Sequence, residues 1–233
     1  EYRRQRQMCI RDRQWIASWG SSLQGQSSEE WTLTNATIRL IARSTISGDR
    51  VRVRLENTFG QEPLTVGAAS VGLQNIGPSL VSDSSRPVQF NGSSTVTIPA
   101  GEYVVSDAVT LAVQAEQGLA VSLFIPGSDV RSSMHRGALT TSYVTELAGG
   151  DQTANSDGEV YSNTTQSMHW LSAVEVFSST ARGAVVAFGD SITEDGVNIP
   201  TVEEFDAFDP DALGLELGYN SGEKLQFCST NDQ

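Results

Sequence analysis

The sequence predicts a mainly β protein: an antiparallel β-sandwich, jelly-roll-like in architecture, followed by the first strand of an incomplete α/β domain. Between residues 14 and 176, short runs of alternating apolar and polar residues are separated by turns rich in Gly, Pro, Asn, Asp and Ser, a pattern typical of antiparallel sheets. About eight runs at this spacing favour two packed sheets. The unbroken apolar run 184–188 predicts the α/β strand, because strands of parallel sheets are buried on both faces.

The alternating runs are assigned to strands in chain order. In the clearest one, residues 51–55, valines and leucine share one face and arginines the other, as in a half-buried strand. Residues 38–43 precede it, and the turn residues 47–49 lie between, so we expect these two strands to form a hairpin. The other predicted strands are 64–73, 95–98, 109–113, 119–125, 141–145 and 170–176.

The chain divides into four segments of different character. Residues 1–13 are rich in Arg and Gln without a helical or strand period; we interpret them as non-native or disordered sequence, the alternative being a basic arm that binds nucleic acid. Residues 14–177 form the predicted sandwich domain. Residues 178–183, with Ser, Thr and Gly, are a predicted linker, and residues 184–233 are the start of the α/β domain with an irregular, acidic tail.

Composition argues against several partners. The chain has 28 acidic residues against 15 lysines and arginines, a formal net charge of −13. Without a basic surplus to meet phosphates, neither nucleic acid nor an anionic membrane is an expected partner. No apolar run approaches the ~18 residues that a membrane span requires. Cys9 and Cys228 lie near opposite ends of the sequence and are weak evidence for a disulfide.

The first candidate site is the turn after the apolar run, where Gly189, Asp190 and Ser191 follow the predicted strand. Ligands of α/β sheets bind at the carboxyl ends of strands. A serine that opens the next helix lies near the positive end of that helix and is well placed to act as a nucleophile. The alternative is that Asp190 or Ser191 caps the helix, and spacing alone favours this simpler role.

Both histidines, His135 and His169, fall in the predicted β domain. Either could be a general base for Ser191 or a metal ligand. Neither has Cys, Asp or Glu at ligand spacing, and Met134 and Trp170 are their direct neighbours. We therefore favour packed, hydrogen-bonded imidazoles, and we expect no metal and no cofactor.

Taken with the apolar strand before it, the stretch Gly189-Asp190-Ser191-Ile192-Thr193 resembles the first sequence block of the SGNH (GDSL) hydrolases, a family of serine esterases and lipases. Earlier segments are similar to a β-sandwich that precedes the hydrolase domain in a secreted-type group of this family. These segments are residues 15–19, 33–39, 51–60, 97–101, 106–107 and 119–123. The resemblance spans roughly residues 14–193.

The resemblance implies hydrolysis of acyl esters, with acylated carbohydrate as one substrate class, through an acyl-serine intermediate. Ser191 would be the nucleophile and would supply one oxyanion-hole N–H, with Gly189 and Asp190 shaping the turn. The resemblance also implies a secreted origin, with a signal peptide that this chain does not contain. The later family blocks have no match: no histidine follows His169, so a base histidine is missing.

Two function hypotheses follow. In the first, the chain is a fragment of an SGNH esterase and is itself inactive, because a serine without its base retains little nucleophilicity. In the second, the β domain acts alone as a non-catalytic binding or scaffolding module for polysaccharide or a partner domain. Four tryptophans could give such a module a stacking surface, although packing is the commoner role: Trp15, Trp19, Trp31 and Trp170. The sequence leaves the oligomeric state open.

Overall fold

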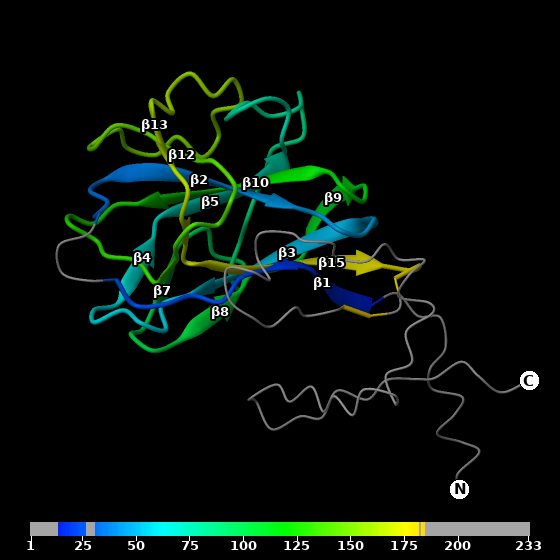
Figure 1. Cartoon of the computed structure of the whole chain (residues 1–233), viewed down its shortest axis with the longest axis horizontal. Helices are drawn as coiled ribbons and strands as arrows, with labels where there is room; N and C mark the ends of the chain where they lie inside the picture. Colours follow the sequence, from blue (N-terminus) through cyan, green and yellow to red (C-terminus); the bar gives the residue numbers. More distant parts are fainter. Residues whose placement is uncertain (1–13, 27–30, 182, 185–233) are drawn as a thin grey trace, which may run out of the picture. The chain divides into compact units, whose positions relative to one another are not determined.

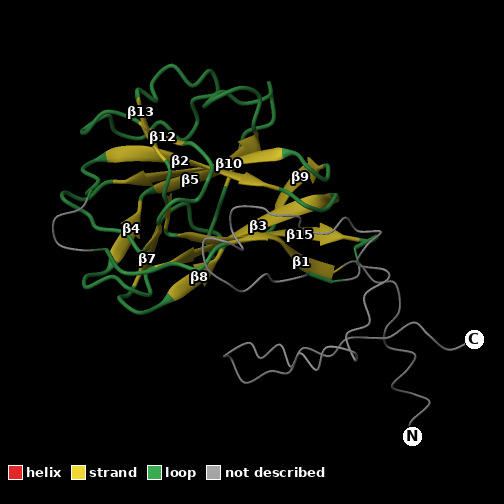
Figure 2. Cartoon of the chain, in the orientation of Figure 1, coloured by secondary structure: helices red, strands yellow, loops and turns green. Residues whose placement is uncertain are grey.

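The computed structural model describes residues 14–26, 31–181 and 183–184. Within these ranges every regular element is a β-strand (Figures 1 and 2), and every strand pair is antiparallel. The mainly β, antiparallel class predicted from the sequence is confirmed. No helix of the described part is long and apolar enough to cross a membrane. Apart from residue 184, the predicted α/β strand lies outside the described residues.

The first large sheet has the strand order β1–β15–β3–β8, with β9 also paired to β3. Strand β3 shows the alternation that its sequence predicts, since Val51, Val53 and Leu55 are buried while the arginines between them are half-buried. The strands of this sheet are β1 (Gln14–Gly20), β3 (Gly48–Glu56), β8 (Tyr103–Val105), β9 (Val109–Val113) and β15 (Leu171–Ser178).

The second large sheet has the order β13–β12–β2–β10–β5–β6. Its central strands, β2 and β10, are buried along nearly their whole length. Its strands are β2 (Ala36–Arg43), β5 (Ala68–Leu73), β6 (Arg86–Pro87), β10 (Gly118–Ile125), β12 (Ser142–Val144) and β13 (Asn163–Thr165). Two short ribbons complete the described fold: β4 (Leu64–Val66) with β7 (Val96–Ile98), and β11 (Met134–His135) with β14 (Met168–His169).

The two large sheets share one hydrophobic core. A single cluster of buried side chains contains Val53 and Val174 of the first sheet together with Leu40 and Val121 of the second. Figure 1 shows the corresponding layers, with β2, β5 and β10 in one and β1, β3 and β15 in the other. The two sheets thus share one core, and the sandwich with jelly-roll-like architecture stays a prediction.

The predicted hairpin between residues 38–43 and 51–55 is wrong. Strand β2 pairs with β10 and β12, whereas β3 pairs with β15, β8 and β9. The turn between them therefore carries the chain from one sheet to the other, and on the way Ser44 and Thr45 bond to Ser18 of β1. Each strand has partners on both sides within its own sheet, β2 between β12 and β10, and β3 between β15 and the pair β8 and β9, so neither has an edge left for the other.

The predicted strand 64–73 is divided into β4 and β5 at Gly67. The backbone N–H of Gly67 donates to the carbonyl of Phe124 at 2.9 Å. A Cβ on Gly67 would come within 2.9 Å of the Phe124 ring. Glycine thus allows the chain to pass close to β10 as it leaves one ribbon for the sheet. The sequence does not predict β1 or the short strands β6, β8, β11, β13 and β14.

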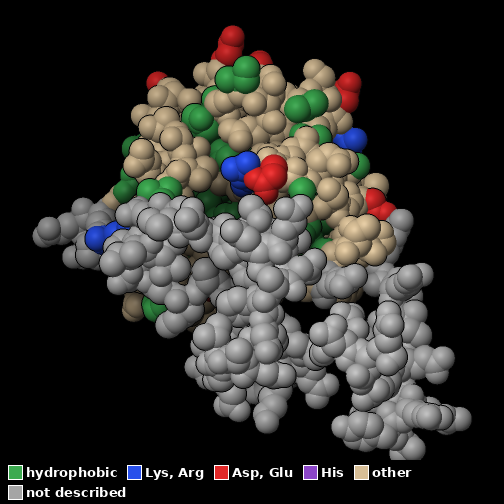
Figure 3. All heavy atoms as spheres, turned by 45° about the vertical axis from the view of Figure 1, so that its right-hand side comes forward, with side chains coloured by type: hydrophobic (Ala, Val, Ile, Leu, Met, Phe, Trp, Pro, Cys, Tyr) green, Lys and Arg blue, Asp and Glu red, His purple; other side chains and the backbone are tan. Residues whose placement is uncertain are grey.

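The outer face of the first sheet is covered by its own side chains. Arg50 lies over Phe177, Arg52 over Trp15 and Arg54 over Tyr103, with guanidinium-to-ring distances of 3.8, 4.6 and 3.9 Å. Ion pairs join Arg52 to Glu175 and Arg54 to Glu56. Figure 3 shows basic and acidic side chains next to each other in the middle of the face it presents. Flat cations over rings shield aromatic surface while their charges stay near water.

The outer face of the second sheet is covered instead by two loops, residues 75–80 and 150–161, which we call the loop layer. In Figure 1 these loops lie on the side of β2 and β10 that faces away from β3 and β15. The amide of Leu80 donates to the carbonyl of Ser156 at 2.8 Å. The φ of Gly158 is +86°, and a Cβ there would come within 2.8 Å of Pro78. The two loops therefore pack directly against each other.

Arg39 connects the loop layer to the sheet. Its side chain is buried in the middle of β2. Its Nε donates to Ser122 Oγ at 2.8 Å, and its two Nη groups donate to the carbonyl oxygens of Pro78 and Asn155. The guanidinium lies 4.3 Å from the ring centre of Tyr161. Burial lowers the pKa of Arg39 and raises the pKa of Tyr161, so the bonds to loop carbonyls offset an unfavourable burial of charge.

We expect Arg39→Met to lower the free energy of unfolding by about 2 to 4 kcal/mol, because it leaves buried carbonyl groups of both loops without donors. Urea titration followed by tryptophan fluorescence measures the change. The matched control is Arg43→Met at the exposed end of the same strand, where an ion pair with Glu116 lies in solvent and the loss should stay within about 0.5 kcal/mol. Equal effects of the two substitutions would contradict the role given to Arg39.

Candidate functional site

The catalytic residues implied by the resemblance, Gly189, Asp190 and Ser191, lie outside the described residues. Both histidines and all four tryptophans of the sequence lie within the described part. Of the two histidines, His169 is the more buried and has a shifted pKa, and the candidate site is built around it.

His169 is 1% exposed and is bound at both ring nitrogens. Its Nδ1 lies 2.8 Å from Ser132 Oγ, and its Nε2 lies 3.3 Å from Thr165 Oγ1. One face of the ring lies against Trp31, with ring centres 4.4 Å apart. On the far side of Ser132, Gln26 Oε1 accepts a hydrogen bond from the Ser132 amide at 3.0 Å. The imidazole is thus enclosed by three separate segments of the chain.

The local backbone explains how His169 reaches this place. It ends β14, where it lies opposite Met134 of β11. The next residue, Trp170, has a φ of +59°, a left-handed conformation that is rare for a bulky aromatic residue. The Trp170 amide donates to Ser133 O at 2.8 Å, and its carbonyl accepts from the Glu56 amide at 2.7 Å. This kink separates the short ribbon from β15 and leaves His169 directed toward Ser132.

A serine hydroxyl bonded to an imidazole is the pairing of a nucleophile with a general base. Ser132 and His169 have the required contact, but Ser132 is only 3% exposed and His169 1%. A substrate carbonyl could not approach Ser132 Oγ in this arrangement. The pair therefore acts as a buried connection between β14 and the segment before β11. The interpretation of His169 as a packed, hydrogen-bonded side chain is confirmed.

Burial lowers the pKa of His169 from 6.5 to about 4. Desolvation is the cause, because a charged imidazolium loses its hydration in this enclosed position. The ring is neutral at pH 7, so one nitrogen donates a hydrogen bond and the other accepts one. Ser132 and Thr165, whose hydroxyls can do either, suit both tautomers.

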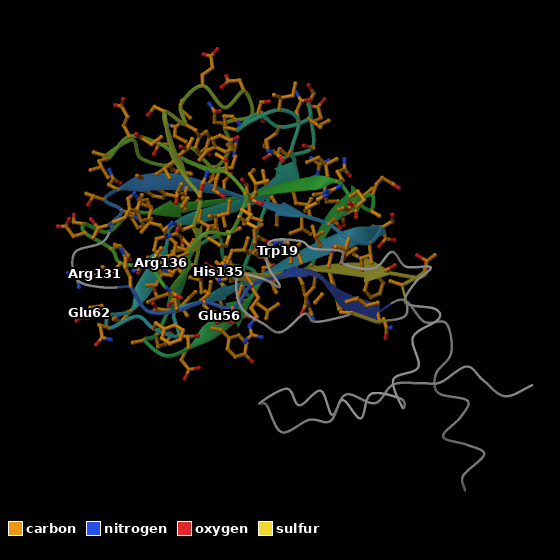
Figure 4. The ribbon with its side chains drawn as sticks, in the orientation of Figure 1. Trp19, Glu56, Glu62, Arg131, His135 and Arg136 are labelled. Atoms are coloured by element: carbon orange, nitrogen blue, oxygen red, sulfur yellow. The ribbon has the colours of Figure 1, made fainter. Side chains whose placement is uncertain are left out.

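His135 lies on β11, the partner strand of β14, and is more exposed to solvent than His169. Its Nδ1–H donates to the carbonyl of Ser22 at 2.8 Å, which ties β11 to the segment that follows β1. In Figure 4 His135 lies with Arg136 and Glu56 between Trp19 at one end and Arg131 at the other. Charged side chains of both signs thus lie along this part of the molecule.

The four tryptophans do not form one stacking surface. Trp170 is fully buried in the shared core, and Trp19 packs against that core. Trp15 lies on the outer face of the first sheet, 5.2 Å from Phe177 between ring centres, and Arg52 covers it. Trp31 is 37% exposed, but its ring also lies against His169. Packing is therefore the main role of these side chains.

Ser132, Thr165 and Gln26 were missed by sequence reasoning. Ser132 lies 37 residues before His169 in the sequence, and Gln26 lies 106 residues before Ser132. No local spacing or motif signals such a contact. Among the residues that the structure describes, no group of three or more His, Cys, Asp or Glu side chains is placed to hold a metal ion.

A scan against models of known protein families finds no match to this sequence, and a search of curated proteins finds no significant relative. The resemblance to the SGNH hydrolases therefore stays a prediction that rests on the sequence segments themselves.

We expect the stability of the domain to fall as the pH is lowered from 6.5 toward 4. Because the pKa of His169 is about 4 in the folded chain against 6.5 ordinarily, the unfolded chain takes up this proton at higher pH. The contribution of neutral His169 is thus complete above pH 6.5 and is lost on acidification. A shift of this size corresponds to about 3 kcal/mol.

Urea titrations at pH 7 and pH 4.5 measure this loss. Replacing His169 with Gln should reduce the difference in the free energy of unfolding between pH 7 and pH 4.5 by about 2 to 3 kcal/mol. The control His135→Gln should leave this difference unchanged. An unchanged difference in the His169→Gln protein would show that His169 is not the group responsible.

Proposed function

We propose that this chain is part of a secreted serine ester hydrolase of the SGNH type, in which the described β domain precedes the hydrolase domain. Ser191 is the nucleophile and one oxyanion N–H donor, and Gly189 and Asp190 form the motif turn. Acyl esters, including those of carbohydrates, are the substrate class. The order of segments supports the proposal: similarity to the family's β-sandwich precedes the Gly189 to Thr193 block, as in that group of hydrolases.

The same proposal makes this chain nearly inactive as an esterase. The sequence has two histidines. The ring nitrogens of His169 contact Ser132 and Thr165, and His135 Nδ1 donates to Ser22. Each imidazole is thus used by the β domain, and a third histidine that could serve Ser191 is absent from the sequence. A serine nucleophile without its base loses several orders of magnitude in rate.

The activity of the chain is tested with a fluorophosphonate probe and a short-chain nitrophenyl ester. We expect the wild type and Ser191→Ala to give the same weak labelling and turnover. Ser132→Ala is the matched control, because it removes the serine that does contact an imidazole. Labelling that requires Ser191 would show that a base reaches it, and labelling that requires Ser132 would place the chemistry in the β domain.

The family assignment is tested separately by sequencing the source gene again from the codon for Thr193 onward, through and past the stretch that encodes residues 194–233. We expect an open frame that encodes a glycine block, a Gly-x-Asn-Asp block and an Asp-x-x-His block, which supply the remaining oxyanion donors and the base. A continuous frame without these blocks would contradict membership of the SGNH hydrolases.

A further inference from the structure

An open cleft of about 370 Å³ lies where the edge of the second sheet meets the first sheet. Strand β6 forms one wall, and β9 with the residues just before it forms the other. Its volume lies within the range of small-ligand sites, roughly 300 to 1,000 Å³. The cleft lies apart from His169 and from the loop layer, and neither the fold nor the proposed chemistry at Ser191 uses it.

Two charged side chains of opposite sign line this cleft in fixed positions. Arg86 donates from Nη1 to the carbonyl oxygens of Asp83 at 2.7 Å and Ser85 at 2.8 Å. The carboxylate of Asp107 accepts from the amides of Asn91 at 3.1 Å and Gly92 at 2.7 Å. These bonds to the backbone hold a donor and an acceptor in place before any ligand arrives, which lowers the ordering cost of binding.

Neutral polar and apolar groups complete the lining. Gln89 and Thr110 can each donate and accept hydrogen bonds, whereas Pro87 and Val109 supply apolar surface. The Asp107 amide donates to the carbonyl of Gln89 at 2.8 Å, so a backbone hydrogen bond joins the two sides of the cleft. The cleft therefore combines donors, acceptors and a small apolar patch within a few residues.

This combination selects among ligand classes. The charge of Arg86 is opposed by Asp107 in the same cleft, so a simple anion is not favoured. A single carboxylate is too few for a divalent cation, which takes several oxygen ligands. A long acyl chain would leave the polar side chains without partners. A sugar ring fits, because its hydroxyl groups both donate and accept while its C–H face is apolar.

We propose that the cleft between β6 and β9 binds a neutral saccharide unit. The site would anchor the carbohydrate part of an ester substrate on the β domain, and in this use the inference rests on the proposed function. Binding itself needs neither Ser191 nor a base. No aromatic side chain lines the cleft, so affinity comes from hydrogen bonds and a small apolar contact, and we expect dissociation constants on the order of millimolar.

The test is a titration of the full chain with cellobiose, xylobiose and mannobiose, followed in ¹H–¹⁵N NMR spectra. At least one disaccharide should shift the amide signals of Gln89 and Thr110 with saturation below about 50 mM. Arg86→Gln and Thr110→Ala should each weaken the binding at least fivefold. Arg43→Gln, which changes an exposed arginine far along another strand, should leave it unchanged.

The outcomes separate the ligand classes. Shifts caused by sodium sulfate but by none of the disaccharides would overturn the proposal in favour of an anion site. Absence of shifts with all four probes, or binding that survives both substitutions in the cleft, would also overturn it. The esterase assay on Ser191 is independent: saccharide binding without Ser191-dependent activity supports this inference alone, and activity without binding removes it alone.

Discussion

A buried guanidinium in the middle of β2 is the interaction on which the arrangement of the second sheet depends. Strands β2 and β10 are buried on both faces, so polar groups on their outer side must find partners within the protein. Arg39 meets this need by donating to Ser122 on the next strand and to carbonyl groups of both covering loops. Loops that would otherwise be solvated coil thereby become part of the packed structure.

The outer faces of the two sheets are covered in different ways. The first sheet keeps its arginines half-exposed and places them over its own aromatic rings, so it needs no second layer. The second sheet carries a covering layer and gains a core on each side. This difference leaves the sheet edges, where β6 approaches β9, as the place at which side chains of both sheets line a common cleft.

Functionally, the β domain retains its histidines for its own structure. His169 connects the segment before β11 to β13 through Ser132 and Thr165, and its tilted ring contact with Trp31 adds the segment before β2. Burial, which lowers the pKa of His169, keeps this ring neutral at pH 7. A domain that used this imidazole for proton transfer would need to expose it, which the kink at Trp170 and the surrounding burial prevent.

The fold class and the most clearly alternating strands could be predicted because alternation is a property of neighbouring residues. The alternation at Val51, Val53 and Leu55 is a property of consecutive residues, and the structure bears it out. Strand partners are not local: the turn before β3 has hairpin chemistry, yet the strands it joins lie in different sheets. A buried Arg39 also could not be foreseen, since its acceptors come from loops distant in sequence.

The candidate site shows the same limit. The apolar neighbours of His169 in the sequence predicted that its side chain is packed. They did not predict its partner, because no sequence motif surrounds Ser132. The residues with the strongest sequence signal, Gly189 to Ser191, lie outside the described residues, so their roles depend on the resemblance alone.

The claim that the β domain uses the His169 imidazole for its own structure is tested most directly by ¹H–¹⁵N NMR of the histidine side chains. We predict that the His169 ring, with a pKa of about 4, stays neutral until the pH falls to about that value. We also predict that its nitrogen chemical shifts are the same in the wild type and in Ser191→Ala. An ordinary pKa near 6.5, or a change in the His169 shifts when Ser191 is replaced, would contradict it.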